Sequence, residues 1–287
     1  MAGGPRILFV TDLHGNRDRY RLVEELAVRE AVAAVVSGGD FLPGGRNLAR
    51  TQAEFHAECF VPHLRALEAA GIGYLGMPGN DDLKVHDGLF RDACAQVSTA
   101  RSIQREKAEL EGYEFIGFDL VADYPFRLKD RCRLDAEGFQ IPPQRGTGLL
   151  SVPEGFQVIP DWPARAASLP TLEDELARLP KPKDPTRAVY VIHMPPAGVG
   201  LDRCGDGREV GSRAVHRFIR KAQPRLTLHG HIHESPEETG IWCTRIGRTV
   251  SIQPGSSEDF IGVLIDLQTL AAVRKNRPAR KPGLLSA

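Results

Sequence analysis

Short apolar runs that stop abruptly at glycine, aspartate, asparagine or histidine recur along this chain of 287 residues. The first three are "RILFVTDLHGN", "AVAAVVSGGD" and "IGYLGMPGNDD", and a helix-like segment follows each of them. Apolar strands that alternate with helices are typical of a partly parallel sheet that is buried on both faces. Such sheets bind ligands at the carboxyl ends of their strands. We therefore expect an α/β fold with polar residues gathered at one edge of the sheet.

The same alternation predicts where the remaining elements lie. In the helix expected after the second strand, Pro62 predicts a kink or break and Gly71 predicts the C-terminal stop. Helices are expected at residues 17–30, 47–71, 83–96, 171–179 and 211–222, and later strands at 187–196, at 225–234 and up to residue 267.

The chain is predicted to form a single domain over residues 1–270, followed by a basic tail over residues 271–287. Between residues 124 and 185 the sequence is rich in proline, glycine and charge and shows no long periodicity, which predicts an insertion or cap with one short helix near its end. The tail is expected to be solvated. A contact with nucleic acid is less favoured because no aromatic residues are interleaved with its basic ones.

Composition excludes few classes of protein. Lys plus Arg equals Asp plus Glu at 37 each, so net charge points to neither nucleic acid nor membrane as a partner. The five cysteines are widely separated and fit neither a disulfide framework nor a CxxC zinc site. The apolar run at residues 7–10 is too short for a signal peptide, and no segment reaches membrane-spanning length. A cytoplasmic location is therefore expected.

Metal-binding side chains stand just beyond the ends of the predicted strands. A set that mixes carboxylate, carboxamide and imidazole suits manganese, iron, zinc or nickel better than magnesium or calcium. Seven such donors exceed the needs of one ion and are about right for two ions that share a carboxylate. The seven are Asp12, His14, Asp40, Asn80, His193, His231 and His233.

The spacing of these donors suggests how they face one cavity. In an extended segment residues i and i+2 project to the same side, so Asp12 with His14, and His231 with His233, would point together. His229 shares this parity, and alternation alone therefore leaves open which two of the three histidines bind metal.

The ordered motifs DxH, GD, GN, an isolated His and GHxH resemble those of the calcineurin-like metallophosphoesterases, over nearly the whole chain from Asp12 to His233. The resemblance implies a four-layer α/β/β/α sandwich of two mixed sheets. It leaves His229 as a packing residue or as a residue that supports the ligands without binding the metal. Within the family, "YPFRLKD", "HMPPAGVGLDR" and "LTLHGHIHESP" are most similar to a bacterial branch related to the cyclic-nucleotide phosphodiesterase Icc. The resemblance implies one ion on Asp12, His14, Asp40 and His233, a bridging role for Asp40, and a second ion on Asn80, His193 and His231.

One motif departs from the family pattern, because the usual GNH reads "GNDD" here. Asp81 takes the place of the histidine that commonly helps to protonate the leaving oxygen, and it could do so only if its pKa were raised. His86 is an alternative donor, although a surface position is favoured for it. General acid catalysis contributes about 10²–10⁴ in rate, so its loss would penalise poor leaving groups most. Phosphodiesters with acidic leaving groups are therefore the favoured substrates.

Contacts to the substrate are predicted with less support from the sequence. Asn16 could hydrogen-bond a phosphate or cap the following helix, and the cap is slightly favoured. Tyr124 and Phe126 in the insertion could wall the pocket. The arginines of "GLDRCGDGREVGS" could grip a phosphate oxygen, or could simply be solvated; they are Arg203, Arg208 and Arg213.

These observations predict a phosphodiesterase with two divalent ions, with manganese as the expected metal. A metal-bridging hydroxide would attack phosphorus while Asn80 and His193 orient the ions. The expected partner is a small phosphoester, such as a nucleotide. Two alternatives stay open: a phosphomonoesterase that acts on nucleotides or phosphoproteins, and a non-catalytic scaffold on the same fold.

Overall fold

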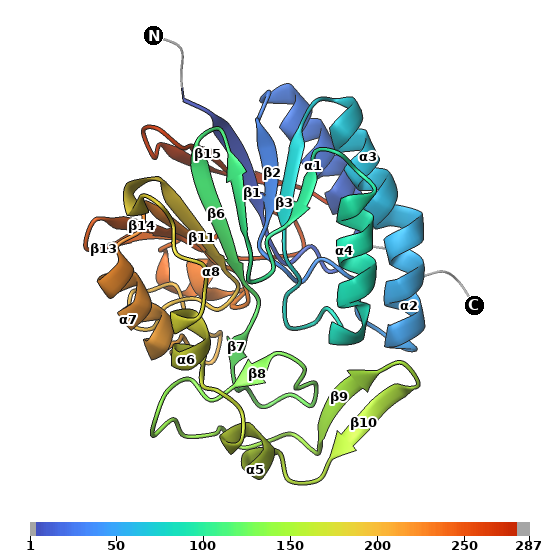
Figure 1. Cartoon of the computed structure of the whole chain (residues 1–287), viewed down its shortest axis with the longest axis vertical. Coiled ribbons are helices and arrows are strands. Elements are labelled where there is room, and N and C mark those ends of the chain that lie inside the picture. The colour runs from blue at the N-terminus through green and yellow to red at the C-terminus, as the bar shows by residue number, and fades with distance from the viewer. Residues whose placement is uncertain (1–3, 280–287) are drawn as a thin grey trace.

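Two six-stranded mixed sheets face each other in the computed structural model of the chain, which describes residues 4–279 (Figure 1). In the first sheet, the four strands β1 to β4 are parallel, and two antiparallel neighbours extend it beyond β1. Its order is β16 (Ala272–Arg277), β15 (Phe260–Asp266), β1 (Arg6–Val10), β2 (Ala34–Ser37), β3 (Gly73–Gly76) and β4 (Ala100–Ser102).

The second sheet has four parallel inner strands and an antiparallel strand at each edge. Its order is β13 (Cys243–Ile246), β14 (Thr249–Ile252), β12 (Leu226–Leu228), β11 (Ala188–Ile192), β6 (Tyr113–Phe118) and β5 (Lys107–Leu110).

Side chains of the inner strands alternate between two cores. Ile7 and Phe9 of β1 lie between the sheets, where Val189 and Val191 of β11 meet them. Leu8 of β1 points the other way, into a core formed with the helices. Because both faces are buried, the strands read as continuous apolar runs. The predicted four-layer α/β/β/α sandwich is thereby confirmed.

Helices cover the outer face of each sheet (Figure 1). On the first sheet these are α1 (Arg17–Arg29), α2 (Leu48–Phe55), the π-helix η1 (His56–Phe60), α3 (Val61–Ala69) and α4 (Asp87–Ala95). On the second they are α6 (Leu172–Ala177) and α7 (Arg213–Ala222). The remaining helical segments are η2 (Lys84–His86), α5 (Trp162–Ala167), η3 (Pro185–Arg187) and α8 (Ser235–Thr239). None of the helices in residues 4–279 combines the length and apolar character that crossing a bilayer requires.

The helix predicted at residues 47–71 forms in three pieces. Pro62 is the second residue of α3, and the helical backbone runs on from η1, so the preceding turn lacks the hydrogen bond that an N–H at this position would donate. The π-helical turn η1 comes directly before it. The predicted break at Pro62 is therefore confirmed, and it takes the form of a widened turn in a helix that continues.

The region predicted as an insertion holds more regular structure than its sequence suggests. The predicted short helix is confirmed as α6. A hairpin of β9 (Gly148–Val152) and β10 (Gly155–Ile159), the helix α5 and the small pair β7 (Val121–Ala122) and β8 (Cys132–Arg133) were not predicted. β9 and β10 show neither the continuous buried run of the predicted strands nor a strict alternation of buried and exposed residues, and β7 and β8 have only two residues each. In Figure 1 the strands β7 to β10 and the helix α5 lie together below the two sheets.

The expectation of a solvated tail from residue 271 is wrong for residues 272–277, which form the edge strand β16. Arg274 of this strand donates to the carbonyl oxygen of Pro254 and to Glu237. Charged residues are common on edge strands because they discourage further strand pairing, so basic composition did not mark a tail here. Residues 280–287 of the predicted tail lie outside the described residues.

Candidate metal centre

Five loops that follow parallel strands meet at one place. The register places Ile7 opposite Ala34 and Val10 opposite Ser37, so β1 and β2 end at the same level. The loops after β3, β11 and β12 arrive at the same edge from both sheets. They bring together all seven predicted donors, Asp12, His14, Asp40, Asn80, His193, His231 and His233.

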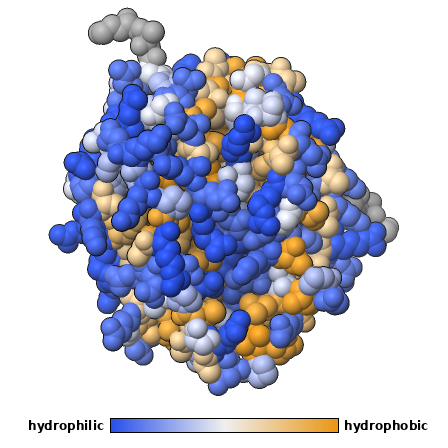
Figure 2. Space-filling view, viewed as in Figure 1, coloured by the Kyte–Doolittle hydropathy of each residue, from blue (hydrophilic) through white to orange (hydrophobic). Residues whose placement is uncertain are grey.

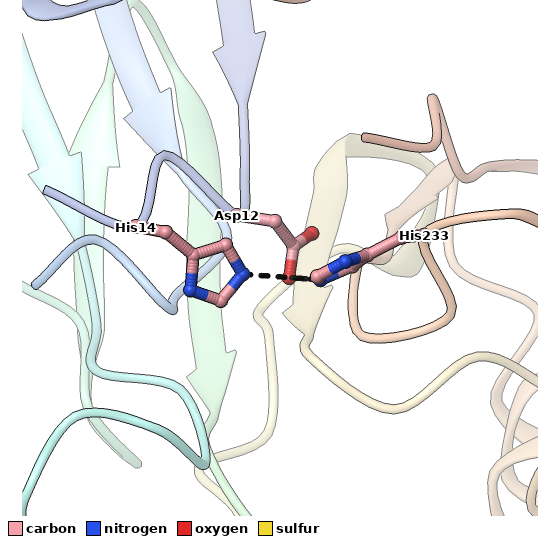
Figure 3. Close-up of side chains that lie close together, drawn as sticks. All are labelled: Asp12, His14 and His233. Carbon is pink, nitrogen blue, oxygen red and sulfur yellow. Dashed lines mark hydrogen bonds and ion pairs between the residues drawn. The ribbon is translucent and has the colours of Figure 1, made fainter. Parts of the chain in front are cut away.

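Asp12, His14 and His233 form the first group of donors (Figure 3). The Nε2 atoms of His14 and His233 lie 3.1 Å apart, and Nε2 of His233 lies 3.2 Å from Oδ1 of Asp12. Figure 3 shows both imidazoles and the carboxylate pointing toward one another although His233 comes from a distant segment.

Asp40, His193 and His231 form the second group. Nε2 of His193 lies 3.2 Å from Oδ2 of Asp40 and 3.0 Å from Oδ1 of Asn80. Nδ1 of His193 lies 2.8 Å from the carbonyl oxygen of Gly38, to which it can donate. That bond leaves the lone pair of Nε2 directed at the cluster.

The backbone that aims these side chains is left-handed and not extended as predicted. Asp12, His14, Asp40 and His231 have φ of 55°, 46°, 50° and 72°. The explanation by strand alternation is therefore wrong, although the residues it brought together do meet. Tight turns after the strand ends produce the convergence, and left-handed non-glycine residues of this kind cluster at functional sites.

Two glycines let the loops approach this closely. A Cβ on Gly79 would lie 2.3 Å from Oδ1 of Asp40, and one on Gly230 would lie 2.6 Å from Oδ2 of Asp12. Neither position has room for a side chain, so both carboxylates can sit against the backbone of a neighbouring loop.

The electrostatics of the cluster favour a cation. Burial disfavours a charged imidazole, but the charges of Asp40 and Asp12 and the hydrogen bonds to these carboxylates together outweigh it. They raise the pKa of His193 to about 10 and that of His233 to about 9. Burial lowers the pKa of His231 to about 3, which keeps its lone pair free. The buried carboxylates thus demand positive charge, and a divalent ion would supply it.

The donor set fits a metal ion on geometric grounds as well. Within each group one ligand atom per residue lies within 4.8 Å of the others, and a third such group joins His14, Asp40 and Asp81. Two imidazole nitrogens that face each other at 3.1 Å across a carboxylate are arranged as ligands of one cation. These residues could therefore hold divalent metal.

Comparison with known proteins identifies the family. The family model for calcineurin-like phosphoesterases matches residues 5–235. The chain belongs to this family. As a calcineurin-like phosphoesterase it is a phosphoester hydrolase of a metal-dependent family. Among curated protein sequences, none matches this phosphoesterase.

Solved structures share the fold at low identity. The structure of TT1561 from Thermus thermophilus matches with a TM-score of 0.58 and 16% identity over 95% of this chain and 99% of that one. A dimetal phosphatase from Danio rerio matches with a TM-score of 0.53 and 12% identity over 96% and 97% of the two chains. At 16% and 12% identity these two matches establish the fold of the phosphoesterase and nothing about its substrate.

The "GNDD" segment of this phosphoesterase carries two aspartates with different surroundings. Asp81 lies at the rim, with Oδ2 3.9 Å from Nδ1 of His14 and 54% of its side chain exposed. The charge of Asp40, together with burial, raises the pKa of Asp81 to about 7. Asp82 is buried and accepts from the backbone N–H of Gly79 at 2.8 Å and of Leu42 at 2.8 Å. Asp82 therefore ties together two of the loops that carry predicted metal ligands of the phosphoesterase.

A buried arginine supports the same loop from the side of the insertion. Arg131 donates from Nε to the carbonyl oxygen of Gly79 at 2.8 Å and pairs with Asp119 and Asp87. Its side chain and that of Asp119 are almost fully buried. Sequence reasoning missed this residue because nothing in its neighbourhood marks it. For Asp82 a signal was present, since the family motif has an acid after GNH.

Of the predicted substrate contacts, Tyr124, Phe126 and Arg208 line the pocket beside the predicted metal ligands, which has a volume of about 720 Å³. Arg203 pairs with Glu209, and Arg213 is exposed in the first turn of α7, outside the lining. Asn16 caps α1, with its side chain accepting from the next turn. Arg145 of the insertion lines the same pocket and was not predicted.

Two further histidines lie outside the cluster. His229 is buried and hydrogen-bonded to the carbonyl oxygens of Ile192 and Met194, which agrees with the packing role that the family pattern left to it. His86 lies in η2, with Nε2 2.8 Å from the carbonyl oxygen of Ala49. It does not replace the missing family histidine.

Proposed function

We propose that this phosphoesterase hydrolyses phosphodiesters with two divalent ions held side by side. The observation that carries the proposal is the pair of neighbouring donor groups, linked by His14 and Asp40, which also share a group with Asp81. In this arrangement Asp40 would serve as a ligand of both ions. The first ion is assigned to Asp12, His14, Asp40 and His233, and the second to Asp40, Asn80, His193 and His231.

When bound, such ions activate water and stabilise negative charge on phosphoryl oxygens. The residues of the chain position them. His193 is oriented by its contact with the carbonyl oxygen of Gly38, and Asn80 is oriented through Nδ2, which donates to Asp81 at 2.8 Å. Manganese is the expected metal, and iron, zinc or nickel suit the same donors.

Asp81 supports a preference for diesters. A carboxylate at the rim adds negative charge where the substrate enters, and a phosphodiester carries one negative charge where a phosphomonoester carries up to two. The charge of Asp40 is the main cause of the raised pKa of Asp81, and divalent ions bound at Asp40 would neutralise that charge and leave Asp81 ionised. An ionised Asp81 cannot supply the proton that the family histidine usually gives to a poor leaving group. Both effects favour diesters with acidic leaving groups.

The test compares bis(p-nitrophenyl) phosphate with p-nitrophenyl phosphate in the presence of manganese. We expect faster turnover of the diester, and loss of at least about 100-fold in kcat for Asp40→Asn. The matched control Asp92→Asn, an exposed carboxylate on α4, should keep wild-type activity. A clear preference for the monoester would overturn the proposal in favour of a monoesterase.

Uptake of two manganese ions without hydrolysis of any phosphoester would instead support the scaffold alternative. The cytoplasmic location and the relation to the Icc branch stay predictions.

A further inference from the structure

The pocket beside the metal-binding residues has an aromatic wall from the insertion. Tyr124 and Phe126 both line it, with their ring centroids 5.8 Å apart. The ring of Tyr124 also lies 5.8 Å from that of His231, a donor of the second group. The rings of His231, Tyr124 and Phe126 therefore form a row that leads from the donor cluster along the wall of the pocket.

Tyr124 is held rigidly in this wall. Its hydroxyl donates to the carbonyl oxygen of Leu128 at 2.7 Å, and the ammonium group of Lys129 lies 4.9 Å from the centre of its ring. Lys129 is itself buried and pairs with Asp123 at 2.7 Å. The inner ring of the wall is therefore fixed by a buried ion pair, so it can hold the outer ring in place.

Phe126 at the outer end is unusually exposed for an aromatic side chain, at 56% of its surface. The guanidinium carbon of Arg145 lies 5.1 Å from the centre of its ring. Among residues 4–279 no carboxylate pairs with Arg145, whereas Arg208 across the pocket is paired with Asp206. The wall thus ends in an exposed ring beside an unpaired cation.

Exposure alone would not mark a site, because single exposed apolar side chains are common. Phe156 in the same insertion is also exposed, at 41%, and does not line the pocket. Figure 2 shows other hydrophobic residues at the lower edge of the molecule, the region of the insertion in Figure 1. What distinguishes Phe126 is its place in the pocket and its partner Arg145.

We propose that Phe126 and Arg145 form a subsite for a planar aromatic group, so that the substrate is a phosphoester whose organic part carries such a ring several ångströms from phosphorus. A nucleobase is the natural example of such a group. The ring stacks on Phe126, and Arg145 adds its charge to the same surface. The inference rests on the proposed function, because it places the phosphoryl group at the metal-binding residues.

The test measures binding to the manganese-loaded protein by calorimetry, with adenosine 5′-monophosphate and ribose 5-phosphate as probes. The two share sugar and phosphate and differ in the base. We expect the wild type to bind the nucleotide about tenfold more tightly, a size typical of one stacked base. Phe126→Ala should abolish that ratio while changing the Kd of ribose 5-phosphate less than about twofold. The control Phe156→Ala should keep the ratio.

Equal binding of the two probes by the wild type, equal loss of both in Phe126→Ala, or binding of neither probe would each overturn the inference. The binding ratio is measured without turnover, so failure of the subsite can be told apart from failure of the proposed hydrolysis. Hydrolysis of bis(p-nitrophenyl) phosphate without a base preference would leave the function standing and remove the subsite. A preference for the nucleotide without hydrolysis of any phosphodiester would support the subsite and overturn the proposed function.

Discussion

Replacing Arg131 by methionine should destabilise the protein strongly. The substitution keeps much of the volume and removes the charge that Asp119 and Asp87 face in the interior. Breaking a buried ion pair by removing one partner costs about 3–5 kcal/mol, because the remaining charge stays buried without compensation. Asp119 keeps a contact with Arg105 at 3.2 Å, so the lower half of that range is expected.

Arg105 provides the matched control, since it pairs with the same carboxylate but has 39% of its side chain exposed. An exposed partner of this kind contributes less than about 1 kcal/mol. The free energy of unfolding of Arg131→Met and Arg105→Met is measured by urea denaturation. If the two variants lost equal stability, burial of the ion pair would not be what matters. Arg131→Met should also bind manganese more weakly, because Arg131 supports the loop that carries Asn80.

Three further changes probe separate parts of the structure. Burial among aromatic rings lowers the pKa of His56 from 6.5 to about 4. As the pH falls from 6.5 to 4, the unfolded chain binds the proton before the folded protein does, so the free energy of unfolding decreases over this range. Urea denaturation should show that the wild type loses up to about 3 kcal/mol more than His56→Leu between pH 7 and pH 4, and equal losses would contradict the linkage. In steady-state assays, Asp81→His should raise the rate for diesters with alkyl leaving groups by about 100-fold relative to the rate for p-nitrophenyl diesters. An equal change in both rates would argue against a proton donor at position 81. Asn16→Ala should cost about 1 kcal/mol of stability and leave KM unchanged; a raised KM with intact stability would point to a substrate contact.

The sequence predicted the sheets and most of the side chains that meet at their edge because both leave local signals. The choice of His231 and His233 over His229 rests on the family resemblance. Strands such as β1 and β11 are buried on both faces and read as apolar runs, and each donor follows such a run directly. The left-handed turns at Asp12 and His231 could not be foreseen, since φ is set by packing between loops that are distant in sequence.

Long-range contacts explain the remaining differences. Arg131 meets Asp87 across 44 positions, and no periodicity relates such a pair. Arg145 lines the pocket from a loop of the insertion, at a position that neither a motif nor a strand end marks in the sequence. Composition alone predicts a tail at residues 272–277, because it does not reveal the strand pairing that makes them the edge strand β16.

The metal content of the protein tests the account most directly. Elemental analysis of manganese-reconstituted and desalted protein should give two ions per chain for the wild type, and fewer for Asp40→Asn, whose carboxylate is assigned to both ions. A wild-type protein that retained at most one ion under saturating manganese would contradict the paired site on which the proposed reaction depends.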